Sequence, residues 1–242
     1  MKRIFMILII ALLNSLLIFC GGNNKLKIAE EYKIKVPEPS GLALSFDKKK
    51  LWTVSDDNNM VYLISLQGKI EKYFTVDAED LEGITVIDEN SIAVVSEHRG
   101  EVLILSNDGK ELTRRKLSLK SKKNAGLEGI AYDLKTKRFF VVQEKKPKIL
   151  VEYNSQFKEI KRTELNFADD LSGLCYIVET NDLWIISDES KLIAKCTTDG
   201  KIKSRRNVSV NQIEGIAVNP ETKKIYLVSD KEEKLYVLEM FN

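Results

Sequence analysis

The sequence is poor in the residues that build disulfide frameworks and zinc sites. It has three cysteines and one histidine in 242 residues. With His98 as the only imidazole, a histidine-based zinc site or a histidine-rich metal centre is excluded. The strand pattern described below places Cys175 and Cys196 two strands apart. Because neighbouring strands lie about 4.8 Å apart, this separation exceeds the reach of a disulfide, and we expect two free, buried thiols.

Proline and glycine are also scarce, and neither sign of charge dominates. Four prolines and twelve glycines exclude collagen-like and low-complexity chains. The contents of 43% hydrophobic and 31% charged residues are typical of a globular protein. The chain is long enough for one large all-β domain or two small ones. Without Lys2 and Arg3, 36 basic residues balance 36 acidic ones, and this lack of a basic excess argues against nucleic-acid binding.

A long apolar run occurs at the N-terminus. Lys2 and Arg3 precede residues 4–19, a stretch of signal-peptide length that is short for a membrane span. The following "LIFCGG" is similar to a bacterial lipobox. We therefore predict a signal peptide over 1–19, lipidation of Cys20, a short tether over 20–27 and one domain over 28–242. Phe19 departs from the small residue usual before such a cysteine, which leaves an uncleaved anchor or a plain secretory signal as alternatives. Each alternative predicts export, and a lipid anchor predicts the cell membrane or the outer membrane.

A repeat of about 44 residues runs through the rest of the chain. Its five copies open with "PSGLAL", "LEGITV", "LEGIAY", "LSGLCY" and "IEGIAV", whose glycines are Gly41, Gly83, Gly129, Gly173 and Gly215. The spacings between these glycines are 42, 46, 44 and 42 residues. Fourteen or fifteen residues after its glycine, each copy closes a second apolar run with an acid: Asp56, Glu97, Glu144, Asp188 and Asp230.

The pattern within each copy predicts four strands, which is the unit of a β-propeller blade. In the second copy we expect strands near 83–88, 91–96, 102–106 and 111–119, with Asp108-Gly109 as a hairpin turn. The last copy ends after three strands, while residues 28–36 supply an extra strand before the first copy. The sequence therefore predicts an all-β, five-bladed propeller in which residues 28–36 complete the last blade. A β-sandwich would not explain the constant phase of the five copies.

The acids of the repeat are predicted to gather on one face. The start of a blade's first strand and the end of its antiparallel second strand emerge together, so Glu82, Glu128 and Glu214 should ring the mouth of the channel. Ser40 and Ser172 occupy the same position in the other two copies, and the closing acids, including Glu144, lie on that face too. Crowded carboxylates need a cation, basic partners or raised pKa values, and calcium suits an all-oxygen site. A competing interpretation holds for the closing acids. They could form hydrogen bonds to neighbouring turns or pair with the basic residues beside them, which are Arg99, Lys145, Lys146 and Lys231.

These repeats resemble the SdiA-regulated (YjiK-like) family of bacterial envelope proteins. The similarity is carried by "DLEGITVIDENSIAVVSEHR", "GLEGIAYDLKTKRFFVVQEKKP", "DLSGLCYIVETNDLWIISDES" and "IEGIAVNPETKKIYLVSD" and extends over residues 28–242. The resemblance implies a five-bladed propeller, distantly related to NHL-repeat proteins, with a calcium site. More remotely, calcium-dependent lactonase and phosphotriesterase propellers place acidic or amide side chains before a first-strand glycine. Glu82, Glu128 and Glu214 match that arrangement, and Ser40 and Ser172 match it less well.

Two functions from different classes follow from these features. The first is a non-enzymatic envelope lipoprotein that binds calcium and uses its acidic face for a small ligand or a protein partner. The alternative is a calcium-dependent hydrolase of lactones, esters or phosphate esters, for which His98 is a candidate base on the same face. The sequence contains no Gly-x-Ser-x-Gly elbow, P-loop or His-Glu-x-x-His motif. A third alternative is a scaffolding propeller that binds no metal.

Overall fold

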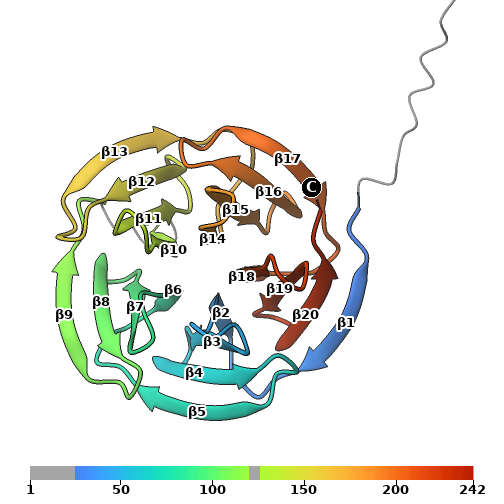
Figure 1. The fold of residues 1–242 in the computed structure, drawn as a ribbon, viewed down its shortest axis with the longest axis horizontal. Helices are drawn as coiled ribbons and strands as arrows, with labels where there is room; N and C mark the ends of the chain where they lie inside the picture. The colour runs from blue at the N-terminus through green and yellow to red at the C-terminus, as the bar shows by residue number, and fades with distance from the viewer. Residues whose placement is uncertain (1–24, 120–125, 242) are drawn as a thin grey trace, which may run out of the picture.

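The computed structural model describes residues 25–119 and 126–241, which form five four-stranded antiparallel sheets arranged in a ring (Figure 1). Each sheet is one blade, with its strands in order from the axis to the rim. Blade 1 contains β2 (Pro39–Leu44), β3 (Lys50–Ser55), β4 (Met60–Ser65) and β5 (Ile70–Thr75). Blade 2 contains β6 (Leu81–Val86), β7 (Ser91–Ser96), β8 (Glu101–Ser106) and β9 (Glu111–Lys116). Blade 3 contains β10 (Leu127–Asp133), β11 (Arg138–Gln143), β12 (Ile149–Tyr153) and β13 (Glu159–Glu164).

The last two blades complete the ring. Blade 4 contains β14 (Gly173–Ile177), β15 (Asp182–Ser187), β16 (Leu192–Thr197) and β17 (Ile202–Asn207). Blade 5 contains β18 (Ile213–Asn219), β19 (Lys224–Ser229), β20 (Lys234–Glu239) and, on its outer edge, β1 (Ile28–Lys33). β1 runs antiparallel to β20, with Lys33 opposite Lys234. The predicted five-bladed fold and its closure by the N-terminal strand are thus confirmed.

Two details of the predicted strands differ from the structure. The closing strand ends at Lys33 rather than at residue 36, and Ile34 and Val36 are instead buried between blades 5 and 1. In blade 2 the first strand spans Leu81–Val86 rather than 83–88, with a β-bulge between Leu81 and Ile84 in its pairing with β7, and the fourth strand ends at Lys116 rather than at residue 119. Glu82 consequently lies inside the strand, not before it.

Apolar residues fill the space between neighbouring blades. Five clusters of buried side chains lie one at each blade-to-blade interface, for example Trp184, Ile186, Ile216 and Leu227 between blades 4 and 5. The second strand of a blade is buried on both faces, as in β7 and β15, whereas the outer strands are polar and largely exposed. Both cysteines are free as predicted, with Cys175 on β14, Cys196 on β16 and β15 between them, but only Cys196 is buried and Cys175 is half-buried.

The five blade glycines allow the innermost strands to pack backbone against backbone. A Cβ on Gly83 would come within 2.5 Å of the Glu128 carbonyl oxygen, and one on Gly173 within 2.8 Å of the Glu214 carbonyl oxygen. Each blade glycine meets the inner strand of the next blade in the same way, and Gly215 meets blade 1 at Gly41 and Leu42. The ring therefore depends on glycine at these positions, because there is no space for a side chain.

Within the described residues no helix is long and apolar enough to cross a membrane.

Replacement of Gly83 by alanine should lower the free energy of unfolding by about 1–3 kcal/mol, because the new methyl group must push two strand backbones apart. Gly173→Ala should behave similarly, since its position in the ring is equivalent. Urea unfolding followed by circular dichroism measures this effect. A loss below about 0.5 kcal/mol in both variants would contradict close backbone packing as the reason for glycine.

Candidate metal centre at the axial mouth

Carboxylates line a cavity at the face of the ring where the inner strands begin. The cavity has a volume of about 280 Å³, and nine of its ten lining residues are acidic. No lysine or arginine is among these ten residues: Glu38, Ser40, Asp56, Asp80, Glu82, Glu97, Glu128, Glu144, Glu214 and Asp230. The predicted gathering of the repeat's acids on one face is thus what the structure shows.

Each lining residue occupies one of three positions in the repeat. The residue directly before the blade glycine contributes Ser40, Glu82, Glu128 and Glu214, and the closing acid contributes Asp56, Glu97, Glu144 and Asp230. The third position lies three residues before the glycine and contributes Glu38 and Asp80. The backbone links the last two positions, because the amide N–H of the closing acid donates to the carbonyl of the third position in four blades, as from Glu97 to Asp80 at 2.8 Å.

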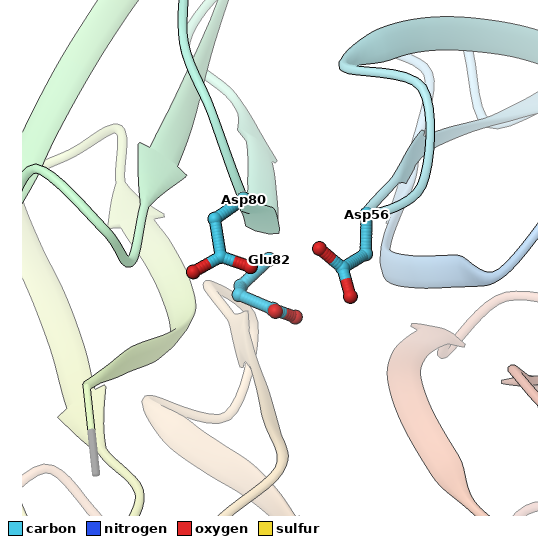
Figure 2. Close-up of side chains that lie close together, drawn as sticks. All are labelled: Asp56, Asp80 and Glu82. Atoms are coloured by element: carbon cyan, nitrogen blue, oxygen red, sulfur yellow. The ribbon is translucent and has the colours of Figure 1, made fainter. Parts of the chain in front are cut away.

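Three carboxylates are close enough to share one metal ion. One oxygen from each of Asp56, Asp80 and Glu82 lies within 4.8 Å of the others. Figure 2 shows the Asp56 and Asp80 carboxylates approaching from two sides with Glu82 between them. The hydroxyl of Ser40 donates to the Glu82 carboxylate at 2.6 Å, which fixes that side chain across the boundary between blades 1 and 2.

Glu128 is a buried acid of the cavity without a bonded partner in the described part of the chain. Its residue is only 8% exposed, and its carboxylate has no hydrogen-bond or ion-pair partner among the described residues. Burying an ionised carboxylate without a partner is costly, so such a group either takes up a proton or meets a cation. Glu214 lines the same cavity, and its carboxylate also has no hydrogen-bond or ion-pair partner among the described residues.

Burial and mutual repulsion raise the pKa values of these acids. Burial, then the charges of the other carboxylates, raises the pKa of Glu82, Glu128 and Glu214 well above the usual value of 4.5. Burial and the adjacent Asp80 carboxyl raise the pKa of Asp56 to about 7 and the pKa of Glu97 to about 7. Burial raises the pKa of Asp230 as well, with Glu233 adding to it. The cavity therefore binds protons at neutral pH in the absence of another cation.

Some predicted residues lie outside this cavity or have local partners. Ser172 donates its hydroxyl to the carbonyl of Ile213 at 2.7 Å and does not line the cavity. Asp188 is turned away, because it pairs with Lys191 at 2.7 Å and accepts from the Ile213 amide at 3.1 Å. Glu144 lines the cavity but pairs with Lys145 at 2.5 Å. For these two closing acids, the interpretation in terms of turns and basic neighbours is the one that the contacts favour.

His98, the candidate base, is 69% exposed and lies 3.8 Å from Glu79, and it is not among the residues that line the cavity.

The sequence interpretation also missed Glu38 and Asp80. Their signal was present in the repeat, as acids three residues before the blade glycine, where the other copies have Gly126, Asp170 and Gln212. Asp170 accepts the Ser187 hydroxyl and the Glu189 amide at the end of β15 and does not line the cavity.

The geometry defines a five-bladed β-propeller with an acidic cavity on its axis. The chain belongs to the SdiA-regulated family, whose profile matches residues 25–239. Among solved structures it is similar to glutaminyl cyclase of Myxococcus xanthus, with a TM-score of 0.71 and 13% identity over 90% of this chain and 98% of that one.

Two further structures are similar at the level of the fold. A chain of a nidogen/laminin complex has a TM-score of 0.60 and 14% identity, covering 84% of this chain and 76% of that one. A streptogramin B lyase has a TM-score of 0.53 and 18% identity, covering 88% of this chain and 73% of that one. At these identities the similarity shows a shared propeller architecture and nothing about activity.

Without metal, the folded protein should lose stability as the pH rises from about 5 to about 8, because folding raises the pKa values of the cavity acids. In that range the folded state holds protons that the unfolded state has released, so the stabilisation present at low pH is lost as these groups ionise. Thermal melting in a chelating buffer across this range measures the effect. A melting temperature that rises steadily to pH 8 would contradict it.

Proposed function

We propose that the protein is an exported, lipid-anchored propeller that binds calcium in the acidic cavity and presents that face to a ligand or partner in the cell envelope. The observation that carries the cation site is the Glu128 carboxylate, buried and unpartnered in a cavity lined by nine acids. An acid in that position gains most from a nearby cation, because no basic side chain of the lining offsets its charge.

The donor set fits calcium better than other common metals. Every lining side chain offers oxygen, whereas zinc and copper sites use imidazole or thiolate ligands that this lining lacks. Calcium accepts six to eight oxygens in flexible geometry, and the cavity holds more carboxylates than one ion requires. Asp56, Asp80 and Glu82 are the candidate ligands on one side, and Glu128 and Glu214 face the same cavity from blades 3 and 5.

A cation in this position would couple the blades to one another. The five candidate ligands come from blades 1, 2, 3 and 5, so one ion would offset repulsion between strands that the ring holds in close contact. The acids left over would keep this mouth negative, which favours a cationic or metal-bridged ligand over an anionic one. The proposed function is therefore binding, with calcium stabilising the ring and shaping the binding surface.

Calcium titration tests the site. In isothermal calorimetry, Glu128→Gln and Glu214→Gln should each weaken calcium binding by at least about tenfold, which corresponds to 1.4 kcal/mol. With calcium at about 100 times its Kd, the wild-type protein should gain about 2.7 kcal/mol of stability. The metal-free Glu128→Gln protein should melt higher than metal-free wild type at pH 8, since a buried charge is removed.

Asp188→Asn is the matched control. Asp188 holds the same repeat position as the cavity acids but pairs with Lys191 outside the cavity. Calcium binding in this variant should stay within about threefold of wild type, because Asp188 acts on the candidate ligand Glu214 through its charge and not as a ligand. The cation site is wrong if wild type shows no calcium-dependent heat or stabilisation, or if Asp188→Asn loses as much affinity as Glu128→Gln.

The hydrolase alternative has less support from the lining. The described residues place carboxylates and one serine hydroxyl at the cavity, and His98 outside it. A screen of lactones, aryl esters and phosphate esters in the presence of calcium separates the two functions. Turnover that disappears in Glu128→Gln and survives in Asp188→Asn would replace the binding proposal with the enzyme.

The lipid anchor rests on the sequence alone, since residues 1–24 lie outside the described residues. It is compatible with the fold because Lys25 lies at the rim, where it forms a bridge to Asn207 of β17, and the cavity lies on the axis (Figure 1). In bacteria that express the full chain, Cys20→Ala should abolish incorporation of labelled palmitate and release the protein from the membrane fraction. Labelling that persists in this variant would exclude lipidation at Cys20.

A further inference from the structure

A second cavity lies at the other end of the axis. Its volume is about 360 Å³, and it is formed where the inner strands end and their loops begin. Its lining includes the residue directly after the blade glycine in four blades: Leu42, Ile84, Ile130 and Leu174. In the acidic cavity the residue directly before the glycine has the corresponding role. In blades 1, 2 and 3 the two lining positions are therefore two residues or about 7 Å apart along the inner strand, with the closely packed blade glycine between them.

The lining of this second cavity is mainly apolar and carries no unbalanced charge. Its charged side chains are Lys48 and Glu179, which form an ion pair at 3.1 Å, and Lys48 also pairs with Glu221 at 2.8 Å. Phe46 and Leu134, which also line it, are 53% and 47% exposed. A ligand with its own charge would have to compete with these pairs, whereas a neutral one would leave them intact.

Two hydroxyl groups on the wall lack partners. Thr85 is 8% exposed, and neither its hydroxyl nor that of Tyr132 makes a hydrogen bond to any described residue. Both hydroxyls are free of bonds within the described part of the protein and line the cavity, so both are available to a ligand that brings a donor or an acceptor. Ligand pockets of a few hundred Å³ typically combine such an apolar wall with a small number of polar groups.

We propose that this cavity binds a neutral, mainly apolar small molecule that carries one hydrogen-bonding group directed at Thr85 and Tyr132. The volume suits a molecule of two or three fused or linked rings, or a short branched chain. The site is independent of the cation site, because it shares no lining residue with the acidic cavity.

A pair of matched fluorescent probes tests the proposal on the full-length protein. N-phenyl-1-naphthylamine is neutral and has one N–H donor, and 8-anilinonaphthalene-1-sulfonate adds a sulfonate to the same rings. The neutral probe should saturate at one per chain with enhanced emission and should bind at least about tenfold more tightly than its anionic analogue. Anionic binding of equal or greater strength would overturn the inference that the ligand is neutral.

Three variants locate the probe. Val86→Trp should fill the cavity and reduce affinity for the neutral probe by at least about tenfold, and Thr85→Val should reduce it by about threefold while keeping the side-chain shape. Glu128→Gln, in the acidic cavity, should leave probe affinity unchanged, so a failure of the calcium site and a failure of this site remain distinguishable. Equal affinity in wild type and Val86→Trp would overturn the proposed site.

Methyl NMR gives a second readout that does not depend on a variant folding. On titration with the neutral probe, the methyl signals of Leu42, Ile84, Ile130 and Leu174 should shift together, since all four line the cavity. Shifts confined to methyl groups elsewhere, such as those of the exposed Leu112 and Ile160 on outer strands, would show superficial binding and reject the proposal.

Discussion

Contact between the backbones of neighbouring inner strands is the constraint on which the rest of this structure depends. The five blade glycines bring each inner strand against the next, so that five chain segments converge on one axis without intervening side chains. Most side chains next to a blade glycine then line one of two cavities on the axis. In four blades the residue before the glycine lines the acidic cavity, and in four blades the residue after it lines the apolar one. The acidic and apolar ends of the axis are therefore two results of one packing arrangement.

This convergence also raises the electrostatic cost of ionising the carboxylates in the acidic cavity. Glu82, Glu128 and Glu214 come from blades far apart in the sequence and are nonetheless buried in one small space. Carboxylates at equivalent positions on an open sheet would remain in water and keep ordinary pKa values. Blade 4 differs from the others because Ser172 and Asp188 bond the backbone of Ile213 in blade 5, and Asp170 accepts the hydroxyl of Ser187 within blade 4. The cavity is consequently asymmetric, with its closest carboxylates at blades 1 and 2.

Most of the fold, and part of the site, could be predicted from the sequence. The constant phase of glycine and closing acid specified five blades, and the unmatched strand before the first copy specified the closure. The axial glutamates followed from strand direction alone. The sequence predicted Asp188 on the acidic face, but in the structure it does not line the cavity, because Lys191, three residues later, offers a nearer partner. Glu38 and Asp80 were missed since they lie in bends before the inner strands, with positive φ values of 39° and 61°, which the strand pattern does not reveal. The apolar cavity was missed because Ile84 or Ile130 has the same sequence signature whether it faces a filled core or an empty pocket.

The pairing of β1 with β20 sets the order of events in folding. Lys33 and Lys234, which lie opposite each other in this pair, are separated by almost the whole chain, so the first strand to leave the ribosome has no partner until the last strand exists. Four blades can form from contacts within about 40 residues of sequence, but the ring closes only through contacts of very long range, which are the pairing of β1 with β20 and the packing of blade 5 on blade 1. Until that contact forms, β20 presents an open edge of blade 5 to any other strand in reach. Formation of the closed ring thus requires that β1 pairs with β20 before either strand pairs with a strand of another molecule.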